Sequence, residues 1–225
     1  VLIAADALPR MFPMLMTAAG MVAPARVLVI GAGVAGLQAI ATARRLGAVV
    51  SGYDIRAAVK EQVESLGARF VVLDVDAAAA EDKGGYARAM GEEFYRKQRE
   101  QMADDLAQQN VVITTAAVPG RRAPLLVDTA MVEAMRPGTV IIDIAADSGG
   151  NCELSVAGEE VVHHGVLVWG GRNVPSGMAY DASRLYARNV VNLLLLMTKE
   201  GRVGVDLADE IIAGVVRTFD GSVRV

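Results

Sequence analysis

The sequence predicts an α/β protein built around a doubly wound parallel sheet, and three observations support this fold class. Short continuous apolar runs, typical of strands that are buried on both faces, alternate with stretches of helical character. Glycines follow the helical stretches, as they commonly do where helices end. Hydrophobic residues make up 53% of the chain but aromatic residues only 4%, and small side chains allow helices to pack closely on a sheet.

The first half of the chain alternates between strands and helices with short connections. Strands are predicted at 27–30, 48–53 and 69–73, and helices at 37–46 and 57–66. Gly47 and Gly67 follow the two helices. Because crossovers between parallel strands are right-handed, we expect these three strands to lie in one parallel sheet.

The second half continues the alternation after an interruption. A polar, alanine-rich interval at 74–85 predicts a loop, and charges at helical spacing predict a solvated helix at 92–109. Further strands are predicted at 111–115, 139–143 and 166–169. Asp128 is placed to cap a helix that runs to Met135.

The two ends of the chain depart from this pattern. Residues 1–16 predict a helix that Pro9 and Pro13 interrupt, and residues 181–197 predict a helix with an apolar second half. Residues 202–225 predict short extended pieces with a hairpin turn at Asp220-Gly221. We therefore expect three segments, 1–20, 21–175 and 176–225, with a boundary near Pro175.

Composition excludes several classes of function. The formal net charge of -4 argues against a general nucleic-acid surface and against a basic membrane patch. No apolar run approaches the ~18–20 residues that a membrane-spanning helix needs, although the mean hydropathy is +0.35. The single cysteine, Cys152, cannot form an intramolecular disulfide or a metal cluster, which suits a reducing compartment.

A glycine-rich turn carries the main functional signal. Gly31, Gly33 and Gly36 form a G-x-G-x-x-G motif that follows a buried strand and opens a helix. Gly31 would make the tight turn, Gly33 would let the backbone approach a pyrophosphate, and Gly36 would let the helix pack close to the strand. The free N–H groups and the positive end of the helix dipole would then attract phosphates.

Asp54 completes this pattern at the end of the next strand, 18 residues beyond Gly36. Its carboxylate could accept hydrogen bonds from both ribose hydroxyls and would repel a 2′-phosphate, which favours NAD over NADP. Arg56 lies close enough to accommodate that phosphate instead, so the preference stays open at this point. The sequence therefore predicts a Rossmann-like dinucleotide-binding domain.

Several segments resemble the NAD(H)-binding alpha subunit of proton-translocating NAD(P) transhydrogenase. They are Met14–Gly20, Gly31–Ala43, Lys60–Gly67, Gly84–Ala87, Gly91–Phe94, Ile113–Ala116 and Gly149–Cys152. Alanine dehydrogenase, a relative, shares the glycine turn and the segment Pro119–Pro124. It lacks the insert that contains Gly84-Gly85-Tyr86 and the charged helix after it, so the insert favours transhydrogenase.

The resemblance implies NAD as cofactor and assigns roles to ten residues. Pyrophosphate contacts fall to Gly31, Gly33, Val34 and Gly36, ribose contacts to Asp54 and Ile55, the cleft lining to Thr115, Ala116 and Ala117, and the closing of a mobile loop to Tyr86. In the family, hydride passes directly to NADP(H) on a partner beta subunit and is coupled to proton movement through a membrane-domain subunit. The resemblance thus implies a cytoplasmic protein, peripheral at the inner membrane, that forms homodimers.

The chain also departs from the family pattern. The family commonly has Leu-Ile where this chain has Ala117-Val118. A family segment that would precede Val1 and position the nicotinamide has no counterpart here, and residues 1–20 and 176–225 resemble parts of that first domain. We therefore expect a fragment or a truncated form with no assigned catalytic residue. An alanine-dehydrogenase-like enzyme, or an NAD-binding module without turnover, remains an alternative.

Other candidate residues are interpreted as structural. His163 and His164 adjoin a predicted strand, where neighbouring side chains point to opposite faces, so a chelating pair and a metal site are not expected. Cys152 lacks the basic surroundings of a nucleophile. Asp143 and Asp147 lie at the end of a predicted strand, where Asp147 could either line the cleft or cap a turn.

Overall fold

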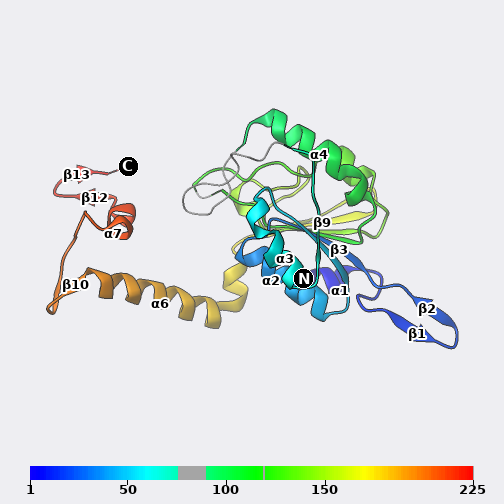
Figure 1. Cartoon of the computed structure of the whole chain (residues 1–225), viewed down its shortest axis with the longest axis horizontal. Helices are drawn as coiled ribbons and strands as arrows, with labels where there is room; N and C mark the ends of the chain where they lie inside the picture. The colour runs from blue at the N-terminus through cyan, green and yellow to red at the C-terminus, as the bar shows by residue number, and fades with distance from the viewer. Residues whose placement is uncertain (76–89, 119, 225) are drawn as a thin grey trace. The chain divides into compact units, whose positions relative to one another are not determined.

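The computed structural model describes residues 1–75, 90–118 and 120–224. Within it, the chain forms two compact units, Val1–Asn173 and Val174–Val225 (Figure 1). The first unit contains the sheet and the predicted nucleotide motif. The assignment of 1–20 and 176–225 to a separate domain stays a prediction.

A seven-stranded sheet forms the centre of the first unit, in the order β5-β4-β3-β6-β7-β9-β8. Its strands are β3 (Arg26–Ile30), β4 (Val49–Tyr53), β5 (Arg69–Phe70), β6 (Val111–Thr114), β7 (Val140–Asp143), β8 (Glu160–His163) and β9 (Val166–Gly170). Each neighbouring pair is parallel except β8 and β9. The predicted fold class, a doubly wound and mostly parallel sheet, is confirmed.

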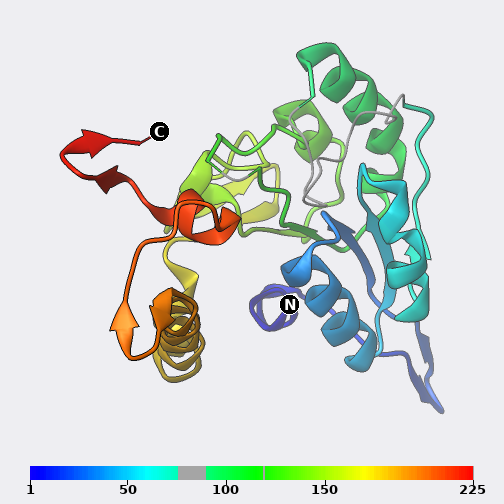
Figure 2. The same ribbon diagram turned by 60° about the vertical axis from the view of Figure 1, so that its left-hand side comes forward.

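Helices cover both faces of this sheet. They are α2 (Val34–Arg45), η1 (Ala57–Val59), α3 (Lys60–Ser65), α4 (Glu92–Ala107), α5 (Thr129–Glu133) and η2 (Ala146–Ser148). Val27 and Val29 of β3 pack in the core beneath α2 and α3, whereas Leu28 and Ile30 pack in the core beneath α4 and α5. Figure 2 shows α2 and α3 side by side on their face of the sheet. The alternation explains why β3 reads as one continuous apolar run.

The N-terminal prediction of a helix over residues 1–16 was wrong beyond its first turns. Helix α1 (Leu2–Ala7) ends before Pro9, and the hairpin β1 (Leu15–Thr17) and β2 (Gly20–Val22) follows. Leu8 is already extended, and neither proline has an N–H for a helical hydrogen bond. Phe12 is buried in the core of the first unit, so tertiary packing holds this segment.

The edge strand β8 was not predicted, and it changes the interpretation of the two histidines. His163 ends β8 and pairs with Val166 of β9, so His164 and Gly165 form a two-residue turn. His164 has a φ of 49°. The expectation that the two side chains point to opposite faces was wrong, because only His163 lies on the strand.

The second unit consists of one long helix followed by short elements. These are η3 (Val174–Met178), α6 (Ala179–Met197), β10 (Thr198–Lys199), β11 (Arg202–Val203), α7 (Glu210–Val215), β12 (Thr218–Phe219) and β13 (Ser222–Val223). The hairpin turn at Asp220-Gly221 is confirmed. Helix α7 was missed, although Asp209 caps it by accepting from the N–H groups of Ile211 and Ile212. No helix among the described residues has the length and apolar character needed to cross a membrane.

Candidate nucleotide-binding site

A pocket of about 720 Å³ opens where β3, β4 and β6 end at their carboxyl edges. In open α/β sheets this edge is where ligands bind. The pocket brings together most of the residues singled out from the sequence: Gly31, Gly33, Val34, Asp54, Ile55, Thr115, Ala116 and Ala117. Gly36 does not line it, and Tyr86 lies outside the described residues.

Two of the three motif glycines are required by the protein's own packing. Gly31 has a φ of +98°, and a Cβ there would lie 2.8 Å from Oγ1 of Thr115. A Cβ at Gly36 would overlap the carbonyl oxygen of Gly31. The hydroxyl of Thr115 donates to that same carbonyl at 2.9 Å. Gly31 and Gly36 therefore shape the turn and set how closely α2 approaches β3.

Gly33 differs, because no packing constraint explains it. It is the N-cap of α2, with φ -78° and ψ -167°, a conformation that any residue can adopt. A Cβ built there meets no heavy atom of the described chain within 4 Å. The first N–H groups of a helix have no partner within the helix and carry its positive dipole end. The turn therefore offers an open, electropositive backbone surface to the pocket.

Asp54 follows β4, is buried, and is held by the glycine turn and by Arg56. Its Oδ2 accepts from the N–H of Ala32 at 2.7 Å and from Nη2 of Arg56 at 2.8 Å. Its Oδ1 accepts from the backbone N–H and from Nε of Arg56, both at 2.9 Å. A carboxylate has about four acceptor positions, so ribose hydroxyls would have to replace contacts of the Arg56 side chain.

Two polar residues of the pocket were missed by sequence reasoning. Gln98 of α4 and Tyr53 of β4 both line the pocket and are buried. The amide of Gln98 and the hydroxyl of Tyr53 make no hydrogen bond to the described part of the chain. Burial, followed by the charge of Asp54, raises the pKa of the Tyr53 hydroxyl, so it stays a donor. Gln98 lies among charged residues, and nothing in that pattern marks it as buried.

The remaining candidates have structural roles. Asp143 is fully buried and accepts only from groups of the protein, and Oδ2 of Asp147 accepts from the N–H of Asn173 at 2.6 Å. This hydrogen bond supports the interpretation of Asp147 as a turn cap. Burial raises the pKa of the Cys152 thiol to about 12. At neutral pH that thiol is protonated, which argues against a nucleophile.

These features together define a class of protein. The strand order, the glycine turn that begins α2, and the acidic residue after β4 are those of a Rossmann-type dinucleotide-binding domain.

Comparison with known proteins places the chain within a family. Residues 1–225 match the family described as "Alanine dehydrogenase/PNT, C-terminal domain". The chain is 54% identical over 217 residues to an NAD(P) transhydrogenase subunit alpha of Rhodospirillum rubrum, covering 95% of this chain and 56% of that protein. It is 28% identical over 204 residues to alanine dehydrogenase of Mycolicibacterium smegmatis, covering 89% of this chain and 49% of that protein.

A solved structure supports the same placement. The crystal structure of transhydrogenase from Sinorhizobium meliloti matches with a TM-score of 0.82 and 44% identity, covering 99% of this chain and 59% of that chain. The protein therefore belongs to the alanine dehydrogenase/PNT C-terminal domain family. The chain spans about half the length of the curated relatives it matches.

Proposed function

We propose that the pocket binds NAD(H). The observation that carries this proposal is Gly33, a helix N-cap beside the pocket whose missing side chain has no packing explanation. A diphosphate needs close approach to bare backbone at such a helix start, and a Cβ would obstruct it. Gly31, Val34 and the helix packing at Gly36 would complete the pyrophosphate site.

The adenosine half of the cofactor would lie toward β4. Asp54 and Ile55 line the pocket there, and the ribose hydroxyls would donate to Asp54 in place of Arg56. Gln98 offers one donor and one acceptor to a base, and burial of such an amide is costly until it is paired. Thr115, Ala116 and Ala117 would line the remaining length of the pocket. Tyr86 is proposed only from the resemblance.

Asp54 is also proposed to make the site prefer NADH over NADPH. Its negative charge would face a 2′-phosphate, and the guanidinium of Arg56 is committed to that carboxylate in a two-point contact. Binding of NADPH would require Arg56 to leave Asp54 and would leave the carboxylate beside the phosphate. Like charges at this separation disfavour binding.

Substitution of Gly33 by alanine tests the nucleotide site directly. We expect Gly33→Ala to weaken NADH binding at least 10-fold in a fluorescence titration. Gly91 provides a matched control, because it is the N-cap of α4 with φ -75° and ψ 160° and has similarly open space. Gly91→Ala therefore carries the same local helix-start cost and should leave NADH affinity unchanged. Equal affinities in the two variants would contradict the proposal.

We further propose that the chain is the NAD(H)-binding component of a transhydrogenase, with hydride passing between NAD(H) here and NADP(H) on a partner beta subunit. The similarity to subunits named NAD(P) transhydrogenase alpha supports this. The proposal includes a homodimer and a peripheral position at the inner membrane through a membrane-domain partner. The nicotinamide of the bound cofactor supplies the hydride; this chain binds and orients it.

Turnover separates this proposal from the alternatives. The full chain, an NADP(H)-binding partner, NADH and an oxidised NADP analogue are mixed, and reduction of the analogue is followed by absorbance. We expect reduction that depends on both proteins. Oxidation of NADH that depends instead on pyruvate and ammonium would indicate an alanine dehydrogenase, and binding without either reaction would indicate a module that only holds the nucleotide.

A further inference from the structure

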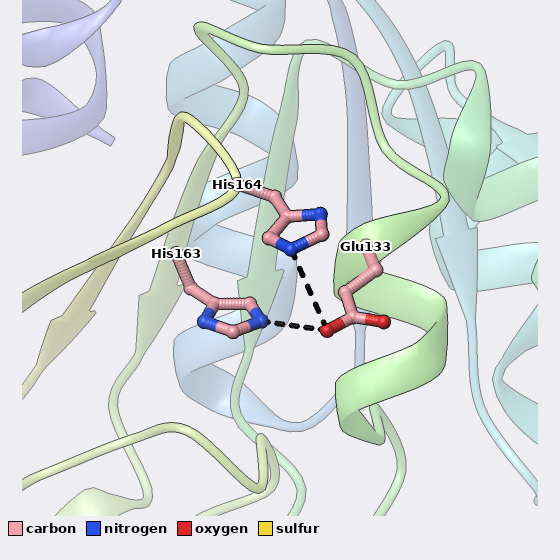
Figure 3. Close-up of side chains that lie close together, drawn as sticks. All are labelled: Glu133, His163 and His164. Carbon is pink, nitrogen blue, oxygen red and sulfur yellow. Dashed lines mark hydrogen bonds and ion pairs between the residues drawn. The ribbon is translucent and has the colours of Figure 1, made fainter.

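A second cluster of chemically capable side chains lies away from the nucleotide pocket, on the turn between β8 and β9. His164 and Gly165 have φ values of 49° and 76°, as in a type I′ hairpin turn. This turn brings the imidazole of His164 beside that of His163. The rings stack with centroids 4.7 Å apart and an interplanar angle of 17°. Both rings face Glu133, the last residue of α5 (Figure 3).

The cluster is held by the surrounding fold rather than by its own contacts. The N–H of Gly138, in the connection after α5, donates to the carbonyl of Gly165 at 2.7 Å. Met131 and Val132 anchor α5 in the core, and β9 pairs with both β7 and β8. The backbone positions of the three side chains are therefore set by two elements that are fixed to the same sheet.

The distances between the ligand atoms suit one small cation. Oε1 of Glu133 lies 2.8 Å from Nε2 of His163 and 3.8 Å from Nε2 of His164. One ligand atom from each residue can be chosen so that all three lie within 4.8 Å of one another. Tetrahedral zinc with bonds of ~2.0–2.1 Å separates its ligand atoms by roughly 3.4 Å, a value between the two distances to Glu133. Small side-chain rotations would equalise them.

The chemistry of the donor set points to a transition metal. Imidazole nitrogen suits zinc, copper and nickel, whereas magnesium and calcium prefer oxygen ligands. A hydrogen bond from His163 lowers the pKa of the Glu133 carboxyl, so it is ionised at neutral pH. The side chains of Glu133 and His164 are 41% and 60% exposed, which leaves room for a water as a fourth ligand.

We propose that Glu133, His163 and His164 form a three-ligand binding site for a divalent transition metal, with zinc as the expected ion. Both Nε2 atoms would coordinate in their unprotonated form, so the ion would replace the proton that links His163 to Glu133. Bound metal would join the end of α5 to the β8–β9 hairpin. The site would act as a structural clip that is separate from the nucleotide pocket.

Zinc titration of the tag-free, chelator-treated full chain by calorimetry tests this site. We expect one zinc per chain, and a rise in the thermal unfolding midpoint when zinc is added. His164→Asn keeps a residue type that tolerates positive φ, and Glu133→Gln keeps the shape of the side chain. Each should weaken zinc binding at least 10-fold and remove most of the thermal effect.

Glu160→Gln is the matched control, because it removes an exposed carboxylate from the same hairpin, outside the cluster. It should bind zinc as the unmodified chain does. Absence of zinc binding, binding of magnesium as tight as that of zinc, or equal zinc affinity in the His164→Asn and Glu160→Gln variants would overturn the proposal.

Discussion

Two aspartates at the ends of parallel strands have opposite relations to their surroundings. Asp143 ends β7 and accepts hydrogen bonds at 2.8–3.0 Å from the hydroxyl of Thr114 and from the N–H groups of Ala145, Asn151 and Cys152. Asp54, after β4, lines the pocket, and three of its four hydrogen bonds come from Arg56.

The difference teaches that a carboxylate at a strand end marks a ligand site only when its partners can be exchanged. A ligand at Asp143 would have to unfold the segment from Ala145 to Cys152. That segment also places Asn151, whose amide donates to the carbonyls of Ala116 and Pro124. A ligand at Asp54 has only to displace an arginine side chain.

The largest effect is expected from Asp143→Ala. Removal of this acceptor leaves buried N–H groups without a partner, and each such group costs about 1–3 kcal/mol. We expect the free energy of unfolding to fall by on the order of 3–5 kcal/mol, measured by urea denaturation. A loss below about 1 kcal/mol would show that the loop does not depend on Asp143 and would break the comparison.

A smaller effect on stability, but a specific effect on binding, is expected from Asp54→Asn. The amide oxygen can still accept from Ala32, whereas the charge that attracts Arg56 and repels a 2′-phosphate is lost. We expect NADH affinity to fall by about 1–3 kcal/mol, or roughly 10- to 100-fold, and the preference for NADH over NADPH to narrow. Parallel titrations with the two nucleotides measure both, and an unchanged ratio would contradict the ribose assignment.

The smallest effect is expected from Gln98→Met. The buried amide has no partner among the described residues, so an apolar side chain of similar shape should leave the free energy of unfolding unchanged or raise it by about 1 kcal/mol. NADH affinity should fall about 3- to 10-fold, the loss of one hydrogen bond. Urea denaturation and fluorescence titration are made on the same samples. A destabilised variant would show that the protein itself pairs Gln98, as it does Asp143.

The central fold could be predicted from the sequence because its signals are local. The apolar run of β3, the glycines around α2 and the return to β4 lie within 28 residues from Arg26 to Tyr53. The elements that were missed depend on distant partners. Strand β8 has a half-exposed alternating pattern that only its pairing with β9 reveals, and residues 8–13 are held by packing into the core.

The site was predictable to the same extent. The glycines and the acid after β4 can be recognised because backbone geometry demands particular residue types at particular spacings. Gln98 cannot, since its burial follows from how α4 rotates onto the sheet. The histidine pair was misjudged because a strand was assumed to continue through a turn that begins at His164.

The hydrogen bond from Thr115 to Gly31 joins residues 84 positions apart in the chain. A peptide containing only β3, α2 and β4 would carry every glycine of the motif and still lack the anchor that fixes its first turn. Assembly of the phosphate cradle must therefore wait until β6 has docked, which makes the capacity to hold a nucleotide a property of the finished sheet.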